Sequence, residues 1–181
     1  MNSFPQVQIS AERLDVREYR PEDAGLVREA VHAGESLALP PGAPSAADGI
    51  AGWLADGAQA PRRSGTGVNL MMLDRAGNRI VGSISLFHVD WEVRSAEIGY
   101  GVRADERGKG YATEALAAVS RWALAAGGLQ RAWLTANTDN VASVRVAEKA
   151  GFTREGTLRR TGLEDDGLHD QALFSLLDDE A

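Results

Sequence analysis

The chain has 181 residues, of which 44% are hydrophobic and 25% charged, and its formal net charge is −7. This composition is typical of one globular domain with a buried core, and it excludes a disordered chain. The negative charge argues against nucleic-acid binding as the main role.

The sequence shows no secretory-signal pattern and contains no cysteine. No apolar run is long enough to span a bilayer, and Met1–Ser10 lack the pattern of a secretory signal, so we expect no membrane association and a cytoplasmic location. The absence of cysteine excludes disulfides, thiolate metal sites and a cysteine acyl carrier. The histidines are widely spaced, so we predict no metal site, and His88 and His169 have the setting of ordinary surface histidines.

The first third of the chain predicts a strand, a helix and a poorly patterned segment. Leu14–Glu18 has the pattern of a short strand, and Pro21 opens a helix that runs to about Ala33. Residues 34–67 are poor in charge and rich in Gly, Ala and Pro. They contain a short predicted helix at Ala47–Leu54 and a stretch expected to be flexible at Arg62–Gly65. We expect this segment to vary with the substrate.

The rest of the chain alternates strands and helices, with a predicted turn at Ala76–Asn78 and helices at Thr113–Ala126 and from the cap Asn140 through Lys149. The predicted strands are Asn69–Leu73, Arg79–Val89, Glu97–Val102, Arg131–Thr135, Phe152–Glu155 and Gln171–Leu177. This order predicts a single mixed α/β domain over residues 1–181.

A loop with two glycines, Arg107-Gly108-Lys109-Gly110-Tyr111-Ala112, lies between a predicted strand and a predicted helix. Its backbone N–H groups, the helix dipole and the charges of Arg103, Arg107 and Lys109 favour an anion such as a pyrophosphate. A glycine-rich turn with solvated basic residues is the plain alternative. A P-loop is excluded because Gly110, not Ser or Thr, follows Gly108-Lys109, and a dinucleotide fingerprint would follow the first strand.

The segments around this loop resemble the GNAT acetyltransferase superfamily, and its RimJ/RimL-type branch in particular. Arg107-x-x-Gly110-x-Ala112 fits the pyrophosphate pattern [Gln/Arg]-x-x-Gly-x-[Gly/Ala] of that family, within AEIGYGVRADERGKGYATEAL. ANTDNVASVRVAEKAGFTREGTLRR and the closing HDQALFSLL are similar to the same branch. The resemblance implies a GNAT fold, in which helices flank a mixed, mostly antiparallel central sheet.

The resemblance also implies acetyl-CoA as the acyl donor. The loop backbone from Arg107 to Ala112 would hold the pyrophosphate, with the Thr113 hydroxyl as a further donor, and the strand at Tyr100 and Val102 would pair with the pantetheine amides. Asn137 and Asn140 would hydrogen-bond pantetheine or substrate, although Asn140 could equally be a helix cap. The predicted cofactor-binding residues are therefore Tyr100, Val102, Arg107, Gly108, Lys109, Gly110, Tyr111, Ala112, Thr113, Asn137 and Asn140.

Two residues are candidates for the proton transfers of an acetyl transfer. Glu97 shares a strand face with Gly99 and Gly101, so its carboxylate is expected to look into open space and to act as a general base. A solvent-facing strand glutamate is the alternative. Ser143 lies where RimL-like enzymes keep a serine that protonates the thiolate, and an ordinary first-turn residue is its alternative. Because the chain lacks cysteine, we expect direct transfer in a ternary complex.

Three functions remain open at this level. The resemblance favours acetylation of a protein or peptide N-terminal α-amine. The alternatives are acetylation of a small amine (an antibiotic, polyamine or amino-acid derivative) and a non-catalytic domain that senses acyl-CoA. Residues 164–181 carry many acidic side chains and no Lys or Arg, which would suit a cationic substrate or a solvated tail. We also predict a homodimer, although nothing in the sequence locates the contact.

Overall fold

The structure is a computed structural model that describes residues 3–32, 39–76 and 79–181. The strands are β1 (Gln8–Ser10), β2 (Leu14–Glu18), β3 (Val68–Asp74), β4 (Arg79–Asp90), β5 (Ser95–Val102), β6 (Arg131–Asn137), β7 (Thr153–Glu164) and β8 (Gly167–Leu177). The helices are α1 (Ala24–His32), α2 (Ile50–Ala55), α3 (Ala60–Ser64), α4 (Tyr111–Ala125) and α5 (Val141–Lys149). Short 3-10 turns are η1 (Pro21–Asp23), η3 (Ala47–Gly49), η4 (Gly57–Gln59) and η5 (Ala104–Glu106).

The eight strands form one sheet in the order β1-β2-β3-β4-β5-β6-β8-β7. Neighbouring strands pair antiparallel, except that β5 and β6 run parallel. A parallel pair needs a crossover connection, and α4 supplies it between these two strands. The mixed, mostly antiparallel sheet with flanking helices is the predicted fold class.

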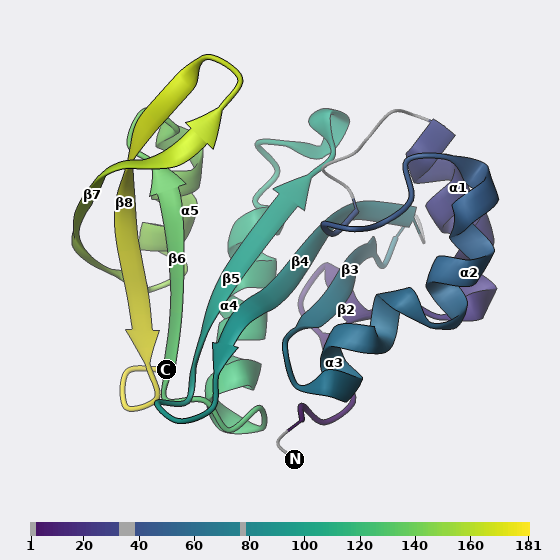
Figure 1. Ribbon diagram of the computed structural model, residues 1–181, viewed down its shortest axis with the longest axis horizontal. Coiled ribbons are helices and arrows are strands. Elements are labelled where there is room, and N and C mark those ends of the chain that lie inside the picture. The colour runs from purple at the N-terminus through teal and green to yellow at the C-terminus, as the bar shows by residue number, and fades with distance from the viewer. Residues whose placement is uncertain (1–2, 33–38, 77–78) are drawn as a thin grey trace.

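The helices divide between the two faces of the sheet (Figure 1). α4 and α5 cover one face, where the large core joins them to side chains such as Ile84, Ile98 and Phe174. α1 and α2 pack with Tyr19, Met71 and Ile80 into a second core over β2 to β4. Because α1 to α3 do not extend over β6 and β8, no helix among the described residues covers that part of the second face (Figure 1).

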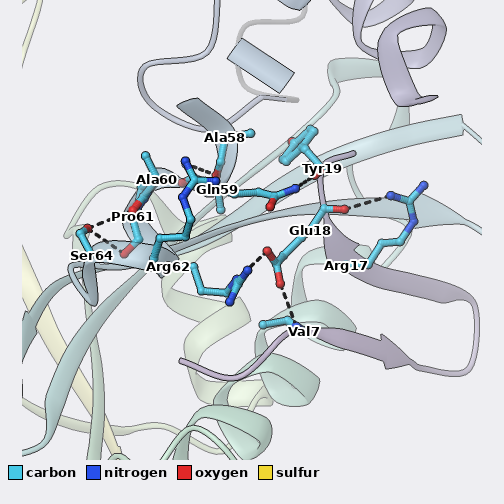
Figure 2. A network of polar contacts seen from close by, with 12 residues as sticks. Val7, Arg17, Glu18, Tyr19, Ala58, Gln59, Ala60, Pro61, Arg62 and Ser64 are labelled. Carbon is cyan, nitrogen blue, oxygen red and sulfur yellow. Dashed lines mark hydrogen bonds and ion pairs between the residues drawn. The ribbon is translucent and has the colours of Figure 1, made fainter. Parts of the chain in front are cut away.

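A buried charge network fixes α3 against the sheet (Figure 2). Glu18 is only 5% exposed, and its carboxylate accepts from Arg62 Nε at 2.8 Å and from the Val7 amide at 3.0 Å. Beside it, Arg17 pairs through two hydrogen bonds with the buried Asp23. Buried charges of this kind are tolerated only when they are paired, so the network holds α3 in place.

Most predicted elements are present, with shifted ends. α5 ends at Lys149 as predicted, and Asn140 caps it through a hydrogen bond from the Ser143 amide. The predicted helix at Ala47–Leu54 is η3 followed by α2. α1 ends at His32, and the predicted helix end at Ala33 lies outside the described residues, as do Gly77 and Asn78 of the predicted turn.

The structure differs from the predicted elements in three places. It adds β1, a strand of only three residues for which nothing was predicted. β7 continues to Glu164, well beyond the predicted Glu155, because it is an exposed edge strand without the alternation of a half-buried one. The stretch expected to be flexible at Arg62–Gly65 instead forms the end of α3, where Gly65 caps the helix with a φ of 76° and Arg62 pairs with Glu18.

Candidate active site

The glycine loop forms the entrance to α4, between η5 and the first helical residue, Tyr111. Gly108 and Gly110 both have left-handed backbone conformations, with φ values of 76° and 86°. Residues with side chains adopt such values at a cost, which explains both glycines. The loop residues 107–110 are exposed and precede the positive end of a 15-residue helix, where the first N–H groups have no partner within the helix. This arrangement fits an anion such as a pyrophosphate.

Arg13, which precedes β2, braces this loop. Its guanidinium donates to the Lys109 carbonyl at 2.7 Å and forms an ion pair with Glu114 at 2.8 Å. It also lies 5.0 Å from the centre of the Tyr111 ring. The sequence reasoning missed Arg13, because no local pattern connects residues 96 to 101 positions apart.

The basic side chains of the loop contribute less free charge than expected. Arg103 is buried and pairs with Asp105, while Lys109 donates to the buried Glu106 at 2.8 Å. Arg107 is exposed and donates to the Val102 carbonyl at 3.3 Å. The expectation of three full charges at the pocket was therefore wrong for Arg103 and Lys109, whose carboxylate partners offset them. Backbone N–H groups and the helix dipole remain the main attraction for an anion.

The two parallel strands part at Glu97. β5 and β6 pair only at Ser95↔Arg131, Ala96↔Ala132 and Glu97↔Trp133. Beyond this junction the described residues of the two strands are not paired with each other, and Figure 1 shows them diverging. The edge of β5 from Ile98 to Val102 thus offers backbone groups to a ligand, with the glycine loop following its far end. Tyr100 and Val102, both predicted cofactor-binding residues, lie on this edge, with their side chains packed toward the large core.

Glu97 lies at this junction and has partners on both sides. Its Oε2 lies 2.8 Å from His88 Nδ1 of β4, and its Oε1 accepts a hydrogen bond from the Thr135 hydroxyl of β6 at 3.4 Å. Its side chain is 13% exposed. The expected open space beside it was wrong at Gly99, because a Cβ there would meet the Phe87 ring at 2.8 Å. The alternative of a freely solvated strand glutamate does not fit these contacts.

Ser143 and Asn140 lie together in the first turn of α5. The Asn140 side chain accepts from the Ser143 amide at 3.1 Å, so the helix-cap alternative for Asn140 is correct. The Tyr100 hydroxyl donates to the Ser143 carbonyl at 3.3 Å, which brings β5 and α5 together. Burial raises the pKa of Tyr100 to about 12, so this hydroxyl stays protonated at neutral pH and keeps its role as a donor.

Asn137, at the end of β6, is turned toward the β7–β8 hairpin. Its amide donates to Glu164 at 2.8 Å and accepts from Gln171 at 3.2 Å. The side chain predicted to contact pantetheine or substrate is thus engaged by β7 and β8. This contact places the acidic end of the hairpin next to the end of β6.

The described residues can also be compared with what a metal site and a membrane-spanning helix require. They contain no cluster of three or more His, Asp or Glu side chains that could hold a metal ion. Within the same residues, no helix has the length and apolar character required to cross a bilayer.

The glycine loop, the parted strands and the mixed sheet are those of an acetyltransferase of the GNAT class. A family model described as an acetyltransferase (GNAT) domain matches residues 13–153, and the chain belongs to this family. A ribosomal-protein acetyltransferase is among its relatives, and RimJ and RimL are among the solved structures that share its fold.

Two curated relatives and one solved structure illustrate the similarity. The chain is 31% identical over 103 residues to the N-acetyltransferase YoaA of Bacillus subtilis, covering 57% of this chain and 58% of YoaA. It is 29% identical over 102 residues to the ribosomal-protein-serine acetyltransferase of Escherichia coli, covering 56% of this chain and 57% of that protein. The alignments thus span somewhat more than half the length of these relatives. RimJ from Mycobacterium smegmatis, solved in complex with CoA-disulfide, superposes with a TM-score of 0.83 at 24% identity, covering 99% of this chain and 91% of RimJ.

Proposed function

We propose that the protein transfers an acetyl group from acetyl-CoA directly to the N-terminal α-amine of a protein or peptide. The observation that carries this proposal is the parting of β5 and β6 at Glu97, with an anion-binding glycine loop following the other end of the same strand. A pyrophosphate at the loop and an extended chain along β5 would bring a thioester to Glu97.

The residues present fit this cofactor. The backbone from Arg107 to Ala112, with the Thr113 hydroxyl, would hold the pyrophosphate, because Gly108 and Gly110 leave the loop amides accessible. The β5 edge at Tyr100 and Val102 would pair with the pantetheine amides. Acetyl-CoA, when bound, supplies a thioester carbonyl that an amine can attack.

The side chains at the junction suit the proton transfers. Glu97 would accept the amine proton, directly or through water, since its carboxylate lies where the strands part. Ser143 in the first turn of α5 would donate a proton to the leaving thiolate. The chain has no cysteine to carry an acyl group, which supports direct attack by the amine. Positioning the amine beside the thioester would then supply much of the rate.

A peptide α-amine is the acceptor that two observations favour. One curated relative is named as an acetyltransferase of serine in a ribosomal protein. In addition, the Asn137–Glu164 contact sets an acidic hairpin next to the end of β6, where the acidic side chains would attract a positively charged amine. The helices α1 to α3 leave this side of the sheet uncovered, which would admit an extended peptide end (Figure 1).

The test is release of free CoA from acetyl-CoA in the presence of a panel of amines. The panel holds peptides with free N-terminal Ser, Ala or Thr, the same peptides with a blocked N-terminus, polyamines and aminoglycosides. We expect release with free-amine peptides and none with the blocked ones. Release only with polyamines or aminoglycosides would favour a small-amine enzyme instead, and tight acetyl-CoA binding without release on any amine would favour a sensor.

A further inference from the structure

His88 occupies an irregularity in β4 that turns its side chain toward Glu97. The pairing of β4 and β5 passes from Phe87↔Glu97 to Asp90↔Ser95, so β4 has one more residue than β5 between these two pairs. In a regular strand His88 would point to the face opposite Phe87 and Glu97. The extra residue is a β-bulge, which re-aims the side chain and brings the imidazole onto the Glu97 face.

The backbone of His88 carries a cost that this contact offsets. Its φ is 48°, in the left-handed region that few residues other than glycine adopt, although His, Asn and Asp do so more often than the rest. Strained residues of this kind are kept where the surrounding structure holds them, and they concentrate at functional sites. Here the ring packs edge-on against Phe87, with 5.0 Å between the ring centres, and its Nδ1 lies 2.8 Å from the Glu97 carboxylate.

The contact defines which nitrogen carries the proton. An ionised carboxylate only accepts hydrogen bonds, so with Glu97 ionised this contact requires a proton on Nδ1 of His88. The Thr135 hydroxyl donates to the other oxygen. Donors from β4 and β6 thus hold the two oxygens of the carboxylate on β5. The exposed fraction is 71% for the His88 side chain and 13% for that of Glu97.

We propose that His88 is a positioning residue for the reaction, which fixes the orientation of the Glu97 carboxylate by donating from Nδ1. This inference rests on the proposed function of Glu97 as the base. A carboxylate held from both sides presents a fixed oxygen to the incoming amine, whereas one released from His88 rotates about its terminal torsion. Losing a defined geometry of this kind lowers turnover without weakening cofactor binding.

Two substitutions separate the side chain from the strained backbone. His88→Gly keeps the left-handed conformation at no steric cost and removes the donor. His88→Asn also tolerates that conformation, and its side-chain amide places an N–H at the position of Nδ1. We expect His88→Gly to lower kcat on the order of 10-fold, as a small misplacement of a catalytic group does, with unchanged KM for acetyl-CoA. His88→Asn should restore most of the loss.

A spectroscopic measurement tests the contact without relying on activity. Correlation spectra of the imidazole nitrogens should show His88 with a proton on Nδ1, although free histidine side chains prefer the other tautomer. The chain has three histidines, so the spectrum of His88→Asn assigns the signal. In Glu97→Gln the amide can donate to Nδ1, and the proton should move to Nε2.

The outcomes distinguish this inference from the proposed function. If the wild-type protein transfers acetyl groups but His88→Gly keeps wild-type kcat, or His88→Asn fails to restore it, the positioning role is overturned. A neutral His88 protonated only on Nε2 in the wild-type protein also overturns it. If no amine in the panel is acetylated, the proposed function fails, and the Nδ1 contact is still confirmed or overturned by the spectra.

Discussion

The two ends of the proposed cofactor path along β5 are built in opposite ways. The loop after Val102 consists of consecutive residues, and its proposed binding groups are backbone amides in a turn with two left-handed glycines. The junction at Glu97 combines side chains from β4, β5 and β6. The loop depends on the local backbone conformation, whereas the junction depends on strands that are distant in sequence and are brought together by the sheet. Substitutions at the loop should therefore change cofactor affinity, whereas substitutions at the junction should change turnover.

Gly110→Glu is the strongest test of the loop, and we expect it to abolish acetyl-CoA binding. The new side chain would repel the pyrophosphate, meet the Arg13 guanidinium at 3.2 Å and force a φ of 86° on a residue with a Cβ. Calorimetry measures the affinity. Gly128→Glu is the matched control for charge and backbone strain. Gly128 follows the other end of α4, has a φ of 75°, and a Cβ added there would have no atom within 4 Å. If a folded Gly110→Glu protein bound acetyl-CoA with unchanged affinity, the loop would not be the pyrophosphate site.

Glu97→Gln tests the junction. It keeps the size of the side chain and removes its basicity, so turnover should fall on the order of 10- to 1000-fold while the acetyl-CoA dissociation constant stays nearly unchanged. The loss should shrink as pH rises toward the pKa near 8 of an α-amine, because more of the amine is then neutral without help. Glu92→Gln, in the turn after β4, is a control for the loss of one exposed carboxylate. Wild-type turnover between pH 6 and 9 would mean that Glu97 is not the base.

Lys109→Ala should have a small effect at the loop. The Lys109 ammonium pairs with Glu106, and Glu106 also contacts Arg79, so removing Lys109 leaves the local charge largely balanced. We expect acetyl-CoA to bind about two- to fivefold more weakly at low salt, with a smaller difference at 0.5 M salt, because exposed charges contribute little and are screened. Isothermal titration at the two salt concentrations measures both values. A loss comparable to that of Gly110→Glu would mean that side-chain charge, not backbone, binds the anion.

The smallest effect is expected at the paired end of β5 and β6, where Arg131 donates to Glu155. The Arg131 guanidinium, with a further hydrogen bond from Ser175, lowers the pKa of Glu155 from its ordinary 4.5 to about 2. A carboxyl group whose pKa is lower in the folded than in the unfolded protein stabilises the fold at pH values above its unfolded pKa. This contribution is lost as the pH falls from 4.5 toward 2. Glu155→Gln should therefore lower the melting temperature slightly at pH 7 and have no effect near pH 2. An equal difference at both pH values would contradict the ion-pair account.

The sequence predicts the loop well because its signals are local. Two glycines before an Ala- and Leu-rich helix predict both the turn and the helix start, and the structure moves that start by two residues, from Thr113 to Tyr111. Strand alternation also predicts that the Glu97 side chain lies on the face of β5 opposite the large core. It does not predict the His88 contact, because the bulge reverses the alternation at that residue. Arg13, Thr135 and Glu164 could not be predicted for a related reason, since their partners are distant in sequence and are brought close by the sheet alone.

The short seam between β5 and β6 has a consequence for hydrogen exchange and stability. Within the sheet, three residue pairs join the five strands β1 to β5 to the three strands β6, β8 and β7, and beyond these pairs the described residues of β5 and β6 have no ladder hydrogen bonds to each other. In the free protein the amides on these facing edges should exchange with solvent faster than those of β4, which is paired on both sides. A cofactor bound between the facing edges of β5 and β6 would contact both parts of the sheet and so connect them. At a concentration 100 times its dissociation constant it would add about 2.7 kcal/mol to the free energy of unfolding. Hydrogen exchange would then slow on both facing edges at once.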